Sequence, residues 1–239
     1  MSATRTQAIK PEHCPDPSCV VKVGHGRGFV IEHRHAVKVP IGSRLTRRGR
    51  PTFSGFRWRT ISRRLIGTAA HCLPQPLPLA PGCWSEDRIY PTLLGKLHDA
   101  ETSIWADCLF ADPIADLALL GSPDGQELYD EAAAFEDFVE AAPVVRIGKP
   151  SNGRGWMLSL AGQWVPITLK LHLGIWGRSL ETDATVPGMS GSPILNRAGL
   201  AIGVVSTGSV SEDQSGQRKN ERAGMQPILV DALPAWLVP

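Results

Sequence analysis

The sequence GMSGSP at residues 188–193 places Ser190 between two glycines, on a turn that can leave its hydroxyl bare. Upstream, GTAAHC at residues 67–72 ends an apolar run in His71, and DLALL at residues 116–120 opens another run with Asp116. A serine hydroxyl becomes a good nucleophile when a base takes its proton, and the base needs a carboxylate that fixes its tautomer. The chain therefore supplies the three groups of a nucleophilic site, in the order His, Asp, Ser.

Size and composition are those of an ordinary globular protein. The chain has 239 residues, of which 24 are Gly and 20 are Pro, and this number of turn-forming residues favours short strands over long helices. The net charge of +2 predicts no nucleic-acid partner. No run approaches the ~20 apolar residues of a membrane span, so we expect no membrane partner. The N-terminus lacks the apolar core of a signal peptide, so we expect either a cytoplasmic protein or one whose leader is missing from this sequence.

The three local sequences, their order and their spacings of 45 and 74 residues resemble those of chymotrypsin/trypsin-like serine peptidases. The residues around Ser190 are most similar to the bacterial-type branch, with its HtrA-type and glutamyl-endopeptidase-type protease domains. The resemblance implies an all-β fold of two six-stranded antiparallel Greek-key β-barrels, with a catalytic cleft between them and a short C-terminal helix. It also implies a serine endopeptidase that acts on protein or peptide substrates and needs no cofactor or metal.

The resemblance assigns roles to four residues. His71 is the general base and then the general acid, Asp116 orients it, and Ser190 attacks the carbonyl. The backbone N–H groups of Gly188 and Ser190 form the oxyanion hole, where a glycine lets the loop turn its amide toward the substrate.

Other residues compete for two of these roles. Ser192 is a second serine in the same hexamer, but Pro193 follows it directly. Asp107 and Asp112 are weaker rivals to Asp116, because neither heads an apolar strand.

The residues of the primary substrate pocket can be located by the same alignment with the peptidase family, counted from Ser190. Counting back six residues from Ser190 without a gap places an alanine at the base of the primary pocket, which predicts an uncharged pocket for a small or apolar side chain. A single gap would place Asp183 there instead and imply cleavage after Lys or Arg. The predicted substrate-binding residues are Ala184, Val205, Ser206, Thr207 and Gly208.

Met189 stands where trypsins carry the aspartate that binds a newly released N-terminus. A methionine cannot form that ion pair, so the site is either preformed or regulated in another way.

The sequence predicts four parts along the chain: an arm at 1–18, a first barrel at 19–122, an acidic linker at 123–143 and a second barrel at 144–239. The linker is expected to contain a helix over 129–142. Strands are expected at 19–23, 28–31, 90–97, 104–110, 117–120, 164–173 and 200–206, and a terminal helix at 228–237. The helix prediction for 129–142 rests on apolar residues at helical spacing.

The first barrel contains a basic insert at 41–64, expected as an extended hairpin or loop. No Asp or Glu occurs from His33 to Ser85, and positions 44–64 hold eight arginines. The insert is either a solvated loop or a docking surface for an acidic or regulatory partner. This leaves an alternative function open: a catalytically silent protease fold that docks a partner through the insert.

Five cysteines are present, and the odd number fits a reducing compartment better than a secreted disulfide framework. A pairing of Cys72 with Cys83 is one alternative. A zinc site from His13, Cys14, Cys19 and His25 is another, although the spacing of these residues is unlike that of common zinc motifs.

Overall fold

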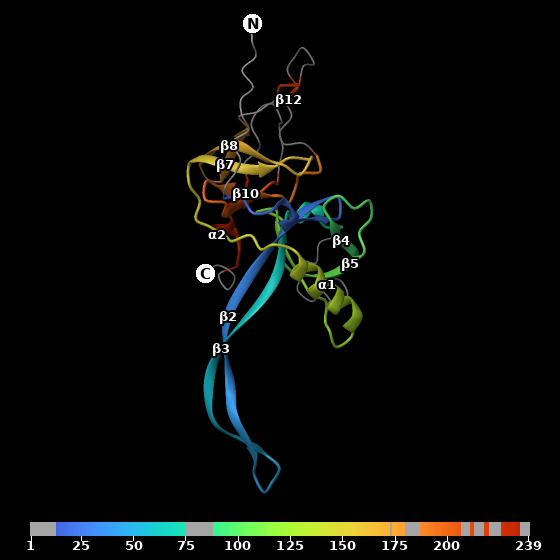
Figure 1. Cartoon of the computed structure of the whole chain (residues 1–239), viewed down its shortest axis with the longest axis vertical. Helices are drawn as coiled ribbons and strands as arrows, with labels where there is room; N and C mark the ends of the chain where they lie inside the picture. Colours follow the sequence, from blue (N-terminus) through green and yellow to red (C-terminus); the bar gives the residue numbers. More distant parts are fainter. Residues whose placement is uncertain are drawn as a thin grey trace.

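The computed structural model of the chain describes residues 13–74, 88–172, 174–179, 187–206, 211–212, 218–219 and 226–234. Two antiparallel β-sheets make up most of the described chain, with a long hairpin projecting from one of them (Figure 1). The expected all-β fold is confirmed. None of the helices formed by the described residues is long and apolar enough to cross a membrane.

The first sheet closes into a six-stranded barrel in the order β1-β2-β3-β6-β5-β4. Closure comes from β1, which pairs antiparallel with β2 on one side and with β4 on the other. The interior is filled by large apolar side chains, among them Phe29, Ile66 and Leu94. The strands are β1 (Val20–Val23), β2 (Gly26–Leu45), β3 (Pro51–Thr68), β4 (Ile89–Lys96), β5 (Ile104–Asp112) and β6 (Leu117–Gly121).

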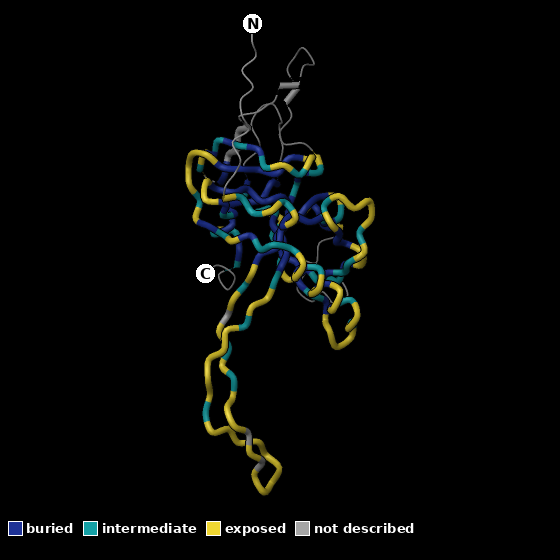
Figure 2. The backbone as a smooth tube through the Cα atoms, viewed as in Figure 1, coloured by how far each residue is buried: buried dark blue, intermediate teal, exposed yellow. Residues whose placement is uncertain are grey.

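Strands β2 and β3 continue far beyond the barrel as a two-stranded ribbon, which we define as residues 34–62. The register runs without a shift from the pair Gly28–Thr68 in the barrel to the pair Leu45–Pro51 near the tip. Apolar burial ends at Ile31 and Leu65, and the ribbon is largely exposed along its length (Figure 2). The predicted insert is therefore an uninterrupted extension of two barrel strands.

The second sheet has five strands in the order β11-β10-β7-β8-β9. Its two edges are joined by the segment 226–228, because Gln226 bridges to Ile175 on β9 and Ile228 bridges to Gly203 on β11. Within the described residues, the expected six strands of the second barrel are therefore corrected to five, with this segment bridging both edges. The strands are β7 (Gly153–Leu158), β8 (Trp164–Leu171), β9 (Ile175–Ser179), β10 (Pro193–Asn196) and β11 (Ala201–Val204), and a separate pair is formed by β12 (Ser211–Glu212) and β13 (Arg218–Lys219).

Helices are few and short. The predicted linker helix is α1 (Tyr129–Ala141), which buries Ala132, Phe135 and Val139, in agreement with the helical spacing of these residues. Arg64, at the base of the ribbon, donates hydrogen bonds to the carbonyls of Val139 and Glu140 and so fixes the C-terminal end of α1. The remaining helices are η1 (Pro17–Cys19), η2 (Ala70–Cys72) and α2 (Leu229–Ala232).

One sequence-based boundary is corrected by tertiary contacts. The terminal helix was expected to begin at Ile228, but that residue bridges to β11, and α2 is confined to four residues before Pro234. The described end of the N-terminal arm is anchored to the second sheet, where the indole N–H of Trp164 donates to the Pro15 carbonyl at 2.8 Å.

Candidate active site

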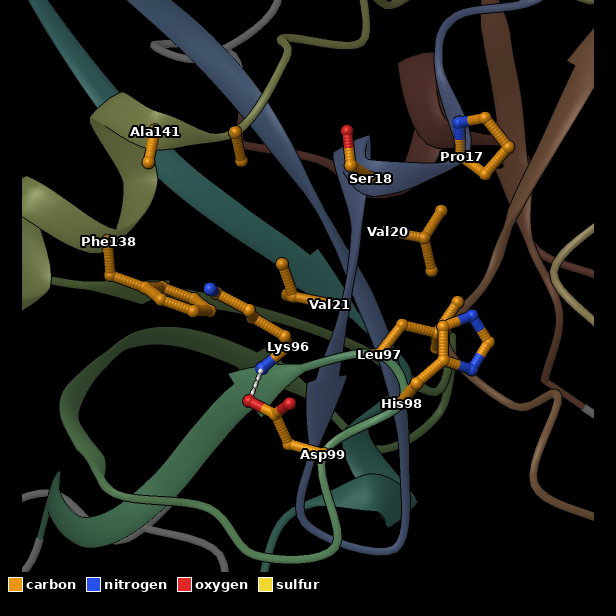
Figure 3. Close-up of a pocket in the computed structure, with 11 residues that line it drawn as sticks. Pro17, Ser18, Val20, Val21, Lys96, Leu97, His98, Asp99, Phe138 and Ala141 are labelled. Atoms are coloured by element: carbon orange, nitrogen blue, oxygen red, sulfur yellow. Dashed lines mark hydrogen bonds between the residues drawn. The ribbon is translucent and has the colours of Figure 1, made fainter.

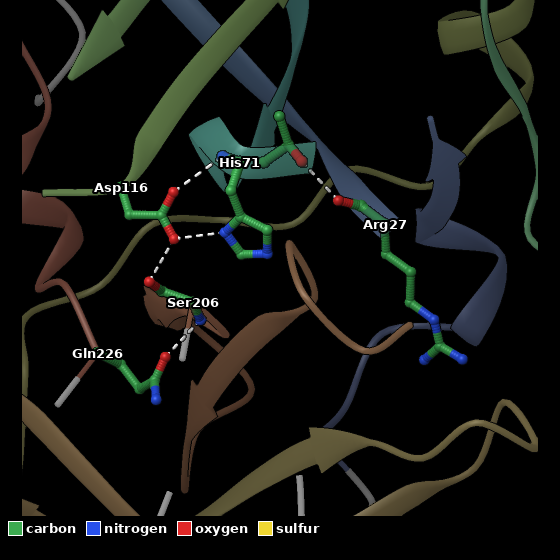
Figure 4. A network of polar contacts seen from close by, with 6 residues as sticks. Arg27, His71, Asp116, Ser206 and Gln226 are labelled. Carbon is green, nitrogen blue, oxygen red and sulfur yellow. Dashed lines mark hydrogen bonds and ion pairs between the residues drawn. The ribbon is translucent and has the colours of Figure 1, made fainter. Parts of the chain in front are cut away.

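His71 and Asp116 meet at the rim of the first barrel. His71 lies on η2, directly after β3, and Asp116 lies just before β6, so the β3–β6 pairing brings their backbones together. The carboxylate is bound twice by His71: Oδ1 accepts from the backbone N–H at 2.9 Å, and Oδ2 lies 2.7 Å from Nδ1 (Figure 4). A carboxylate beside Nδ1 favours the tautomer that carries its proton there, which leaves Nε2 able to accept a proton.

A third donor holds Asp116 from the other sheet. The Ser206 hydroxyl donates to Oδ2 of Asp116 at 2.5 Å, and the Ser206 backbone N–H donates in turn to the side-chain carbonyl of Gln226. Gln226 is 1% exposed, so this amide lies deep behind the site. Asp116 also has a φ of +51°, a backbone conformation that costs about 1 kcal/mol or more and persists where surrounding contacts enforce it.

The Ser190 loop is held against the start of β2. The Arg27 backbone N–H donates to the Ser190 carbonyl at 2.7 Å, and the hydroxyl of Thr68 donates to the Arg27 carbonyl at 2.6 Å. A Cβ on Gly26 would lie 2.8 Å from the Ser190 carbonyl and 2.3 Å from the Cys72 sulfur. Ser190 is thus fixed beside the two residues, Thr68 and Cys72, that flank the His71 segment.

Gly191 explains why the loop can approach so closely. Its φ is +84°, and a Cβ there would lie 1.7 Å from the Arg27 carbonyl oxygen. Only a residue without a side chain fits this contact. Gly188, at the other side of Ser190, has a φ of +91°, the kind of conformation expected for a loop that turns an amide outward.

Arg27, a residue that is 4% exposed, also reaches into the second sheet through its side chain. Its guanidinium donates to the carbonyls of Leu158, Ser159 and Leu160 at 2.9–3.3 Å. Burial lowers the pKa of Arg27. One methyl group of Leu160 lies 3.5 Å from where a Cβ on Gly188 would be, so this arginine supports the backbone beside the predicted oxyanion hole.

The two serines of the hexamer differ in access. Ser190 is partly exposed, whereas Ser192 is completely buried and its backbone carbonyl accepts a hydrogen bond from the Val205 N–H at 2.8 Å. A buried hydroxyl cannot reach a substrate. Among the described residues, the N–H groups of Gly188 and Ser190 donate to no other backbone group, which is what the predicted oxyanion hole requires.

The rival aspartates have other positions. Asp112 accepts from the N–H groups of Ile114 and Ala115 and shapes the turn that leads to Asp116. Asp107 lies 3.7 Å from Arg88, and burial raises the pKa of its carboxyl. Neither forms a hydrogen bond with His71 among the contacts of the described residues.

The predicted substrate-binding residues are described only in part. Val205 is buried and its carbonyl accepts from the Gly191 N–H at 2.7 Å, so it supports the Ser190 loop from behind. Ser206 was predicted as a substrate-binding edge, and its side chain proves to be bound to Asp116. Ala184, its rival Asp183, Thr207 and Gly208 lie outside the described residues.

The sequence reasoning missed Arg27, Gln226 and the Asp116 contact of Ser206. An arginine inside the apolar strand sequence at 26–31 is a signal that could have drawn attention to Arg27. Gln226 carries no local signal, because its role depends on the sheet edges that meet around it.

A cavity of about 380 Å³ lies elsewhere, between β1, the turn after β4 and the end of α1 (Figure 3). Val21, Leu97 and Phe138 give it apolar walls, and Lys96, His98 and Asp99 line its polar side. None of the three predicted catalytic residues lines it.

The cysteines and histidines form no metal-binding group of three or more within the described ranges. Cys72 is a free, buried thiol, so the alternative pairing with Cys83 is wrong. Burial raises the pKa of Cys72 to about 11.

Two solved protease structures are similar to this chain. A solved structure of the Rv3671c protease in its inactive form is 15% identical and has a TM-score of 0.43, with 80% of this chain and 79% of that chain covered. A serine protease from a human pathogenic astrovirus is 13% identical with a TM-score of 0.43, covering 85% and 94% of the two chains.

No curated protein matches the chain. The model of the trypsin-like peptidase domain, by contrast, matches residues 53–204, which is more than half of the sequence and includes the segments around His71, Asp116 and Ser190. The chain therefore belongs to the trypsin-like peptidase domain family.

Proposed function

We propose that this protein is an active serine endopeptidase in which His71, Asp116 and Ser190 form the catalytic triad. The observation that carries the proposal is the carboxylate of Asp116, which binds both the backbone and the Nδ1 of His71. An imidazole held in this way presents a basic Nε2. The Ser190 loop, fixed beside the same segment, supplies the one partly exposed serine of the hexamer.

The chemistry follows from these groups. Nε2 of His71 takes the proton of the Ser190 hydroxyl as the oxygen attacks the scissile carbonyl. The negative charge on the tetrahedral oxygen is bound by the N–H groups of Gly188 and Ser190. His71 then gives its proton to the leaving amine, and a water molecule, deprotonated by the same imidazole, hydrolyses the acyl ester on Ser190.

A preformed loop is part of the proposal. Met189 is 2% exposed and packs among the apolar residues of the second sheet, including Met157 and Ile194. Full burial of such a side chain contributes roughly 1.5–3 kcal/mol. This packing and the fit of Gly191 order the loop without an ion pair to a new N-terminus.

The primary specificity pocket is proposed to be uncharged and to accept small or apolar side chains. The support is the ungapped alignment that puts Ala184 at its base, together with the apolar Val205 behind the Ser190 loop. A panel of peptide anilides that differ only at the residue before the scissile bond tests this. Preferred cleavage after Lys or Arg would favour Asp183 at the base instead.

The test of the triad is labelling by a fluorophosphonate probe, which reacts with an activated serine. We expect the parent protein to be labelled, Ser190→Ala to be unlabelled, and Ser192→Ala to be labelled as fast as the parent. Ser192→Ala is the matched control, since it removes the neighbouring hydroxyl. Labelling of Ser190→Ala would refute the assignment of the nucleophile. A folded parent that is neither labelled nor cleaves the panel would support the catalytically silent docking protein.

A further inference from the structure

The ribbon defined above separates charge along the molecule. It contains eight Arg and Lys residues and no Asp or Glu, which leaves 17 cationic and 23 acidic residues in the rest of the chain. The net charge of +2 is therefore the sum of a strongly basic ribbon and an acidic remainder. The expectation that no nucleic acid binds rested on the net charge alone, and net charge does not describe such a distribution.

Cations occupy both faces of the ribbon. Directly paired residues of antiparallel strands share a face and successive residues alternate. The pairs Val37–Arg59 and Val39–Arg57 put two arginines on one face, and the pairs Lys38–Trp58 and Arg44–Thr52 put cations on the other. Three more arginines surround the turn at the tip: Arg47, Arg48 and Arg50.

Aromatic side chains are exposed between these cations. Trp58 is 71% exposed and Phe56 is 55% exposed, and the ammonium of Lys38 lies 4.8 Å from the centre of the Phe56 ring. Arg34, near the base, is paired with Glu32. Among the described residues, none of the other ribbon cations forms a salt bridge. Large apolar groups interleaved with free arginines indicate a surface that binds a partner.

A partner that matches this surface must present negative charge to two opposite faces at once. A flat membrane or the surface of a folded acidic protein faces only one side of a ribbon. The major groove of duplex DNA has a phosphate wall on each side, is about 12 Å wide and admits a two-stranded β-ribbon. Arginine suits this environment, because its guanidinium binds phosphate in a bidentate manner.

The dimensions of the ribbon agree with this fit. Its strands lie about 5 Å apart and, at about 3.3 Å per residue, the twelve residues from Arg34 to Leu45 span about 40 Å, which is more than one helical turn of DNA. It projects away from both sheets, so the acidic remainder of the molecule stays clear of the phosphates (Figure 1). We propose that the ribbon inserts edge-on into the major groove of double-stranded DNA, with the cations of its two faces on the phosphates of the two walls and its exposed aromatic residues packed against the sugars between those phosphates.

The experiment measures binding of the full-length protein to a fluorescein-labelled 24-base-pair duplex by anisotropy, across a range of NaCl concentrations. If about five ribbon cations contact phosphates, the plot of log Kobs against log salt has a slope of about −4.5. The double variant Arg57→Gln/Arg59→Gln should reduce the magnitude of the slope by about 2 and weaken binding roughly 10- to 100-fold at 0.1 M salt. Trp58→Ala should weaken binding with the slope unchanged.

The matched control is Arg146→Gln/Arg197→Gln, which removes the same charge from exposed positions outside the ribbon. It should bind like the parent. All variants should keep the melting temperature of the parent, because the substituted side chains are exposed. Ser190→Ala should also bind like the parent, which separates this proposal from the catalytic one.

Three outcomes would overturn the proposal. The first is the absence of salt-dependent binding to the duplex. The second is equal loss of affinity in the ribbon variant and in the matched control. The third is binding to single-stranded DNA, poly-glutamate or anionic lipid vesicles that is as tight as binding to the duplex, since none of these has a groove.

Discussion

Replacing Gly191 with alanine tests how the Ser190 loop is held. The new Cβ would lie 1.7 Å from the Arg27 carbonyl oxygen and 2.7 Å from the hydroxyl oxygen of Thr68, at a φ of +84°. The backbone conformation costs an alanine about 1–2 kcal/mol. Relief of the overlap requires movement of the loop or of β2, at about 1–3 kcal/mol. Together these predict a loss of about 3 kcal/mol of stability.

For a chain of this size, about 3 kcal/mol corresponds to a fall in melting temperature of about 9 °C. The shift should also displace Ser190 from its position beside the His71 segment, and a displacement of about 1 Å can lower the rate about 100-fold. Scanning calorimetry measures the first effect, and the rate of fluorophosphonate labelling measures the second.

The matched control is Gly153→Ala at the exposed start of β7. Gly153 also has a positive φ, +109°, but no atom lies within 4 Å of its added Cβ. It should show the backbone cost alone, about 1–2 kcal/mol, with the labelling rate unchanged. If Gly191→Ala melts and labels like Gly153→Ala, the close contact with Arg27 does not hold the loop, and the reasoning fails.

Three further predictions concern the surroundings of the site. Ser206→Ala removes one of the three donors to Asp116 and should lower kcat/KM at least tenfold, because a hydrogen bond to a charged group contributes about 1.5 kcal/mol or more. Ser192→Ala should leave kcat/KM unchanged in the same peptide assay. Burial raises the pKa of Cys14 and Cys19 to about 12 and the pKa of Cys72 and Cys108 to about 11. Because the thiolate is the reactive form, iodoacetamide at pH 8 should modify these cysteines only when urea unfolds the protein, as measured by peptide mass spectrometry. Rapid modification of the native protein would contradict this. Burial also raises the pKa of Asp107, so the contribution of this residue to stability is greatest below its ordinary pKa and falls as pH rises through the folded pKa. In urea unfolding, the stability of Asp107→Asn should therefore increase relative to that of the parent between pH 4 and pH 7. A difference in unfolding free energy that stays constant over this range would refute the prediction.

Local patterns predicted the elements whose signal lies within a few residues. The helical spacing around Phe135 and Val139 located α1 to within one residue of its end. Strict alternation predicted β8, where Val165, Ile167 and Leu169 are buried. The candidate His71 and Asp116 could be identified because each lies beside an apolar strand, and the β3–β6 pairing then brings them together.

What sequence could not provide depends on contacts between distant segments. The segment 226–228 bridges both edges of the second sheet, whereas the sequence from Ile228 onward predicted a helix. The roles of Arg27 and Gln226 arise from carbonyl and amide groups contributed by other strands. The length of the ribbon was also hidden, because only the register shows that β2 and β3 continue without a shift to the tip.

Hydrogen bonds between the two sheets hold the candidate site together, so the site is complete only when both sheets are associated. The Ser190 carbonyl and the carbonyls of residues 158–160 are held by Arg27 of the first sheet, while Asp116 is held by Ser206 of the second. A chain cut in the exposed segment 124–127 would therefore yield two fragments, each with an incomplete site. The proposed peptide hydrolysis would return only as the fragments recombine, so the protein could serve as a split reporter whose signal is that hydrolysis.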